Sequence, residues 1–65
     1  MKGTIKKLLG SKKCGFVRGE DNVEYFFHAS AIKNARFENL REGSEVEFEE
    51  GESGKGPRAE EVYLK

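Results

Sequence analysis

Hydrophobic and polar positions alternate along most of this 65-residue chain. In residues 45–49, for example, valine and phenylalanine alternate with glutamates, and similar short runs are separated by glycine-rich or polar turns. A period of two is typical of strands with one buried face, and no stretch keeps the apolar spacing of a helix for three turns. The pattern predicts five strands: Thr4–Leu9, Cys14–Arg18, Val23–His28, Glu45–Glu49 and Ala59–Leu64.

The segments between these strands are rich in turn-forming residues. Gly19–Asn22 predicts a tight hairpin between the second and third strands. After the third strand we expect one helical turn capped by Ser30, then a polar connection over 33–43, and a loop over 51–57. The apolar spacing of the last strand breaks strict alternation, which indicates a bulge. Short strands without edge protection favour closure, so the pattern predicts a single all-β domain over 1–65, a five-stranded antiparallel barrel.

The third strand contains three consecutive aromatic residues followed by the only histidine of the chain. Alternation places Tyr25 and Phe27 on the buried face, and Phe26 and His28 on the opposite face beside Phe16. The opposite register would only exchange the exposed rings, because moving Phe26 inward would expose Phe27. Aromatic rings are therefore predicted on the outer surface of the sheet.

The formal net charge is zero, but the charge is unevenly distributed. Residues 1–19 contain six basic residues and no acid, whereas residues 20–52 contain ten acids and three basic residues. Exposed rings beside basic side chains suit single-stranded nucleic acid, because bases stack on rings at about 1–3 kcal/mol each and cations contact phosphates. On charge alone, a solvated surface without a partner remains the simpler interpretation.

Other kinds of chemistry have little support in the sequence. A single cysteine, Cys14, and a single histidine exclude a disulfide framework and a four-ligand zinc site, so we expect no metal and no cofactor. The segment "GESGKG" lacks the spacing of a phosphate-binding loop, and we find no catalytic constellation, so the chain is not predicted to be an enzyme. An unpaired thiol without a signal segment or a long apolar run predicts a cytoplasmic protein that has no membrane contact.

Several segments together resemble bacterial cold-shock proteins. "KKCGFV" and "EYFFHASAI" are similar to the two ribonucleoprotein motifs of that family, and "GTIKKLL", "LREGSEVEF" and "GKGPRAEEV" extend the resemblance over almost the whole chain. The family is a five-stranded OB-fold barrel that binds single-stranded RNA and DNA. The resemblance therefore implies a monomeric OB-fold protein that acts as an RNA chaperone or as a regulator of transcription or translation.

The resemblance also implies which residues contact the single-stranded nucleic acid. Phe16, Phe26 and His28 match the family's stacking residues, and Leu8 stands where the family has a tryptophan. Further aromatics of the family are replaced here at Leu9, Cys14 and Ala29, so we expect weak binding with little sequence preference. We add Arg18, because it lies two residues from Phe16 in the same strand and on the same face. The residues expected to contact nucleic acid are Lys7, Leu8, Lys13, Phe16, Arg18, Phe26, His28, Phe37, Lys55 and Arg58.

A second function remains open from the sequence. If most stacking positions have been lost, then Leu8, Leu9, Cys14 and Phe16 could form an apolar patch for a protein partner. The two functions differ in their response to salt, because neutralising phosphates gives an affinity that falls steeply with salt and an apolar patch does not.

Overall fold

The computed structural model describes residues 1–53 and 56–65. These residues form all five predicted strands and two short 3-10 helices. The elements are β1 (Lys2–Leu9), β2 (Cys14–Gly19), β3 (Glu24–His28), η1 (Ala29–Ala31), η2 (Phe37–Asn39), β4 (Glu45–Ser53) and β5 (Gly56–Leu64). The main difference from the prediction concerns 51–57, expected to be a loop, because β4 and β5 extend into it on either side of 54–55.

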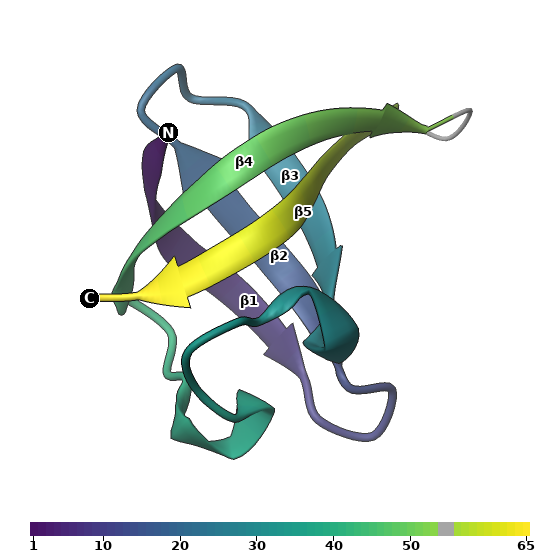
Figure 1. Ribbon diagram of the computed structural model, residues 1–65, viewed down its shortest axis with the longest axis vertical. Coiled ribbons are helices and arrows are strands. Elements are labelled where there is room, and N and C mark those ends of the chain that lie inside the picture. Colours follow the sequence, from purple (N-terminus) through teal and green to yellow (C-terminus); the bar gives the residue numbers. More distant parts are fainter. Residues whose placement is uncertain (54–55) are drawn as a thin grey trace.

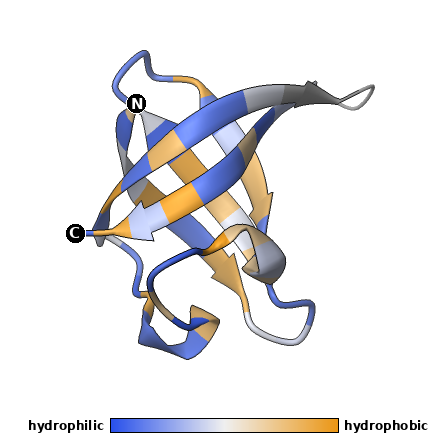
Figure 2. Cartoon of the chain, in the orientation of Figure 1, coloured by the Kyte–Doolittle hydropathy of each residue, from blue (hydrophilic) through white to orange (hydrophobic). Residues whose placement is uncertain are grey.

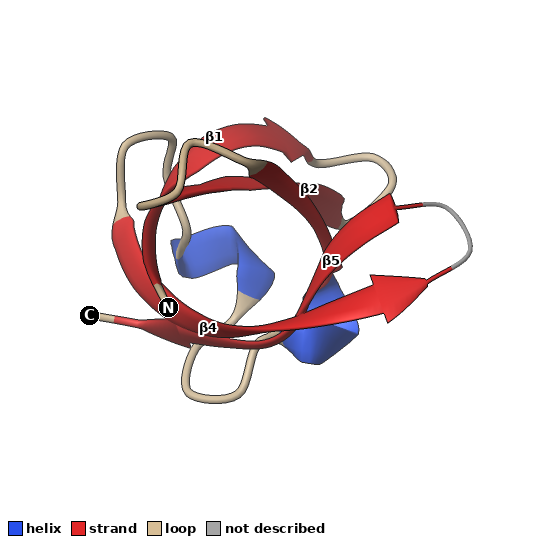
Figure 3. Cartoon of the chain, turned by 90° about the horizontal axis from the view of Figure 1, so that it is seen from above, coloured by secondary structure: helices blue, strands red, loops and turns tan. Residues whose placement is uncertain are grey.

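The strands close into a barrel in the order β1-β2-β3-β5-β4 (Figures 1 and 3). The predicted all-β, five-stranded barrel is thereby confirmed. Neighbouring strands run antiparallel, with one exception: β3 and β5 are parallel. A closed ring with an odd number of strands cannot reverse direction at every step, so at least one parallel pair is required. Both 3-10 helices lie at the end of the barrel where β1 ends (Figure 1).

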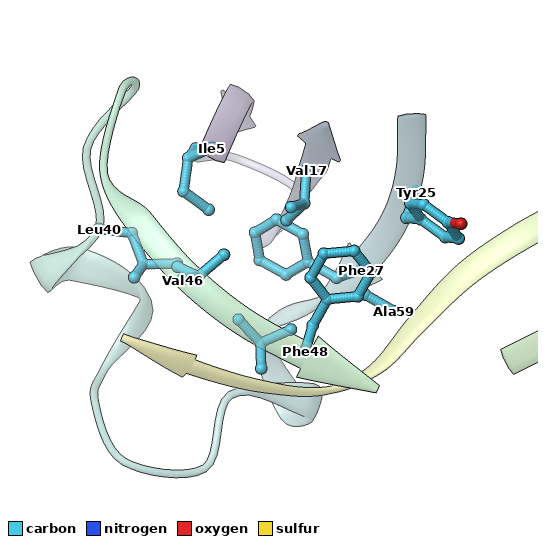
Figure 4. Packing of buried hydrophobic residues seen from close by; sticks show 9 residues of the cluster. Ile5, Val17, Tyr25, Phe27, Leu40, Val46, Phe48 and Ala59 are labelled. Carbon is cyan, nitrogen blue, oxygen red and sulfur yellow. The ribbon is translucent and has the colours of Figure 1, made fainter. Parts of the chain in front are cut away.

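The barrel interior is filled by the apolar side chains that alternation assigned to the buried face. Hydrophobic and hydrophilic positions can be seen alternating along the strands in Figure 2. Tyr25 and Phe27 are 4% and 0% exposed, as predicted, and the Tyr25 ring centre lies 4.9 Å from that of Phe48. Leu40, in the connection expected to be polar, also enters the core. The buried cluster consists of Ile5, Val17, Tyr25, Phe27, Leu40, Val46, Phe48, Ala59 and Val62 (Figure 4).

Two β-bulges change which side chains face outward. In β5, Glu60 is the extra residue, because Glu49 pairs with Glu61 and Glu50 pairs with Ala59, which confirms the bulge predicted in the last strand. The bulge in β1 was not predicted. There Ile5 pairs with Val17 but Lys7 pairs with Phe16, so Lys6 is the extra residue. Beyond Lys6 the alternation of β1 is therefore shifted by one position.

A buried tyrosine joins the β2–β3 turn to β4. The Tyr25 hydroxyl donates to Asp21 Oδ2 at 2.6 Å and also lies 2.9 Å from Glu50 Oε2. Because a hydroxyl has one proton, the shorter contact is the better hydrogen bond. It lowers the pKa of Asp21, and the backbone N–H of Val23 contributes further in the same direction. The turn is thus tied to the barrel by a charge-assisted hydrogen bond.

Within the described part of the chain, no helix has the length and apolar character needed to cross a membrane.

Candidate nucleic-acid interface

Four side chains from four neighbouring strands form a line across the outside of the barrel. Lys7 of β1 pairs with Phe16 of β2, Phe16 pairs with Phe26 of β3, and Phe26 pairs with Arg58 of β5. Paired residues project from the same face of a sheet, with Cβ atoms about 4.5–5.5 Å apart in antiparallel pairs. The line, which we call the outer row, therefore places two rings between two cations.

The two rings of the outer row support each other. The centres of Phe16 and Phe26 lie 5.7 Å apart, with an angle of 71° between the ring planes, which is an edge-to-face contact. The guanidinium carbon of Arg58 lies 5.8 Å from the centre of the Phe26 ring, within cation–π range. Both rings are partly exposed. Rings held by such contacts lose little freedom when a base stacks on them.

A second line, next to the outer row, contains Leu9, Cys14 and His28. The His28 side chain is exposed, whereas Cys14 is only 6% exposed, so its thiol offers little surface to a ligand. His28 Nδ1 accepts a hydrogen bond of 3.2 Å from the backbone N–H of Ser30 and caps η1. The expected capping residue, Ser30, is therefore the donor and not the cap. Because Nδ1 is an acceptor, the neutral ring carries its proton on Nε2, which can donate to a base or a phosphate.

Two of the expected cations lie next to carboxylates. The ammonium group of Lys13, at the end of the β1–β2 turn, lies 3.8 Å from the carboxylate of Glu38 in η2. Arg18 pairs across the hairpin with Glu24, so both side chains project from the outer face. Sequence reasoning missed both carboxylates. Alternation could have identified Glu24, which has the same parity as Phe26 and His28 in β3.

Two of the expected contact residues pack toward the core and do not face outward with the outer row. Leu8 is partly buried: it pairs with Gly15 and packs against the core cluster, because the bulge at Lys6 turns Lys7 outward in its place. Phe37 is partly buried and also packs against the core from η2. Lys55 lies outside the described residues. The structure thus brings together Lys7, Phe16, Arg18, Phe26, His28 and Arg58 on one face, with Lys13 at its margin.

This surface offers aromatic rings for stacking and cations for charge. Among residues 1–53 and 56–65, no three histidine, cysteine or acidic side chains come together as a metal site would require. Unstacked bases need open aromatic faces, and a phosphate backbone needs cations alongside them. Both are present in the outer row, where two rings lie between two cations along one line across the strands.

Comparisons with known proteins all identify the same family. The family model described as "'Cold-shock' DNA-binding domain" matches residues 1–65. The chain is similar to Cold shock protein 1 of Lactiplantibacillus plantarum, with 43% identity over 60 residues, covering 92% of this chain and 91% of the relative. Cold shock-like protein CspLB of Listeria monocytogenes is also 43% identical, with the same coverage. The cold shock-like protein of Thermotoga maritima is 40% identical over 64 residues, covering 98% of this chain and 97% of the relative.

Proposed function

Since this chain belongs to the cold-shock domain family, we propose that its outer row holds single-stranded RNA or DNA and thereby opposes RNA secondary structure. Family membership makes the chain a nucleic-acid-binding protein and not an enzyme. The finer role proposed here is that of an RNA chaperone or a regulator of transcription or translation. In this proposal one domain acts alone, as a cytoplasmic monomer without a cofactor.

The proposal rests on one observation, the edge-to-face pair of Phe16 and Phe26 between Lys7 and Arg58. Two bases stacked at about 1–3 kcal/mol each would supply about 2–6 kcal/mol. A stabilisation of about 6 kcal/mol corresponds to a Kd of only tens of micromolar, so stacking alone gives weak binding. Contacts between the phosphates and the cations must supply the remaining binding free energy, so the affinity should fall as the salt concentration rises.

This mode of binding would oppose base pairing without any reaction. A base that stacks on a ring is not available to stack or pair within an RNA hairpin. Because every base has a π face, two phenylalanine platforms tolerate most sequences. Weak, salt-dependent contacts would also release the strand readily, as a chaperone of transient structure requires.

A titration with short single strands would test the proposal. We would measure the affinity of the protein for fluorescent oligo-dT and oligo-U of seven nucleotides at 50 and 200 mM salt. We expect saturable binding that weakens steeply with salt, and a lower melting temperature for an RNA hairpin when the protein is added. Binding that does not respond to salt, or a hairpin that melts at the same temperature, would contradict the proposal.

The alternative function as a protein-interaction module receives less support. It depended on an apolar patch of Leu8, Leu9, Cys14 and Phe16. In the structure Cys14 is buried, and Leu8, which is partly exposed like Leu9 and Phe16, packs against the core cluster. The burial of Cys14 and the inward packing of Leu8 leave a smaller apolar patch than the sequence indicated.

A further inference from the structure

We infer that Glu38 competes with the phosphates of a bound strand for Lys13, so that the segment containing η2 limits the affinity of the interface. The inference rests on the proposed function and concerns its strength. It starts from the ion pair between the Lys13 ammonium group and the Glu38 carboxylate, which lie 3.8 Å apart. The two residues belong to segments that are far apart in the sequence, the β1–β2 turn and η2.

The backbone on both sides of this ion pair is held in place. The carbonyl of Lys13 accepts a hydrogen bond of 2.8 Å from the N–H of Ala29, which fixes the turn against the start of η1. On the other side, the residues flanking Glu38 hold η2 against the barrel. Phe37 packs against the core cluster, and Leu40, two residues beyond Glu38, is 5% exposed. Glu38 is therefore presented to Lys13 by an anchored element and is not a carboxylate on a free loop.

The position of the pair determines which contact it would weaken. Lys13 directly precedes Cys14, which pairs with His28 at the margin of the outer face. A phosphate that reaches Lys13 from this face either displaces the Glu38 carboxylate or shares the ammonium group with it, and in both cases it lies close to a negative charge. In contrast, among the side chains of residues 1–51 and 56–65, Lys7 and Arg58 of the outer row form no ion pair within 4.0 Å. The nucleic-acid strand would thus be held firmly at the rings of the outer row and weakly at Lys13.

The size of the effect follows from the exposure of the pair. The side chains of Lys13 and Glu38 are 58% and 65% exposed, so water and salt screen their attraction. Removing the Glu38 charge should therefore tighten binding by about two- to fivefold at low salt. A phosphate that binds Lys13 in its place should also steepen the dependence of log K on log salt by about 0.7.

A double-mutant cycle provides the test, with seven-nucleotide oligo-dT as the probe and circular dichroism to confirm the fold of each variant. We expect Glu38→Gln to tighten binding two- to fivefold, and to have no effect when Lys13→Gln is already present. Glu49→Gln is the matched control, because it removes the same charge from the outer face of β4, and it should change the affinity by less than about 1.5-fold.

Three results would overturn the inference while leaving the proposed function intact. Equal tightening by Glu38→Gln with and without Lys13, or equal tightening by Glu49→Gln, would indicate a general effect of net charge. An unchanged affinity in Glu38→Gln would overturn it as well. If the unmodified protein shows no saturable binding of oligo-dT at low salt, the proposed function itself fails, and this inference fails with it.

Discussion

Lys7 lies directly opposite Phe16 on the outer face of the barrel, because Lys6 is the extra residue of a bulge in β1. Without that bulge, the alternation set by Ile5 would turn Lys7 inward and Leu8 outward. The bulge thus exchanges an apolar side chain for a cation beside the two rings. The outer row owes its order of cation, ring, ring and cation to this one irregularity.

Phe26 and Phe27 are neighbours on opposite faces of β3, so truncating them should have opposite consequences. Phe26→Ala removes a partly exposed ring and should abolish most oligonucleotide binding at a small cost in stability. Phe27→Ala leaves a cavity in the core and should lower the free energy of unfolding by about 3–5 kcal/mol. Urea unfolding and oligo-dT titration of both variants would check this. Two variants with the same affinity and the same stability would contradict the two-faced strand.

A ring added at position 7 should act as a third stacking platform, whereas one added at position 8 should not. Lys7→Trp places an indole beside Phe16 and gives up one cation. We therefore expect a salt slope shallower by about 0.7 and tighter binding than the unmodified protein at about 0.5 M salt, where phosphate contacts contribute least. Leu8→Trp pushes a larger side chain toward the core and should cost about 1–3 kcal/mol of stability. Tighter binding by Leu8→Trp alone would show that the orientation of β1 is wrong.

His28 caps η1, and in the proposed interface its exposed ring also contacts the nucleic-acid strand, so two substitutions can separate these roles. Asparagine is a good capping residue without a ring, so His28→Asn should keep most of the stability and lose affinity. His28→Ala should lose the affinity and in addition about 1 kcal/mol of stability. Thermal unfolding and oligo-U titration of the two variants provide the measurements. If His28→Asn bound as tightly as the unmodified protein, the ring would have no part in binding.

The hydrogen bond from Tyr25 predicts a specific dependence of stability on pH. It lowers the pKa of Asp21 below its ordinary value of 3.8. A carboxyl group whose pKa is lower in the folded state stabilises the protein above its unfolded-state pKa, and this stabilisation is lost as the pH falls through the folded-state value. Below about pH 4, the unfolding free energy of Asp21→Asn should therefore fall less steeply than that of the unmodified protein. Urea unfolding at pH 5, 4 and 3 would reveal the difference, and parallel curves would exclude this role for Asp21.

The hairpin of β2 and β3 could be predicted from the sequence because no bulge interrupts it. Its alternation assigned Phe16 and Phe26 outward and Tyr25 inward, and the structure agrees. The bulge in β5 was also visible, because the spacing of its apolar residues breaks the period of two. The bulge in β1 was not, because Lys6 and Lys7 are both polar and either could face solvent.

The remaining features depend on tertiary contacts that no local pattern encodes. Glu38 meets Lys13 only because η2 folds back toward the β1–β2 turn, and the anchors of η2 are single apolar residues in a polar segment. Leu40 is one of these anchors. A lone leucine among polar residues gives no periodicity from which its burial could be predicted.

NMR spectroscopy can observe directly whether bases stack on the paired rings of Phe16 and Phe26. We would assign the ring protons of the five phenylalanines and titrate the protein with oligo-dT of seven nucleotides. We expect upfield shifts of the Phe16 and Phe26 ring protons and intermolecular NOEs from both rings to thymine protons, with little change at Phe48 in the core. Shifts and NOEs confined to the outer face of β4 and β5, with both outer rings unperturbed at saturation, would contradict this expectation.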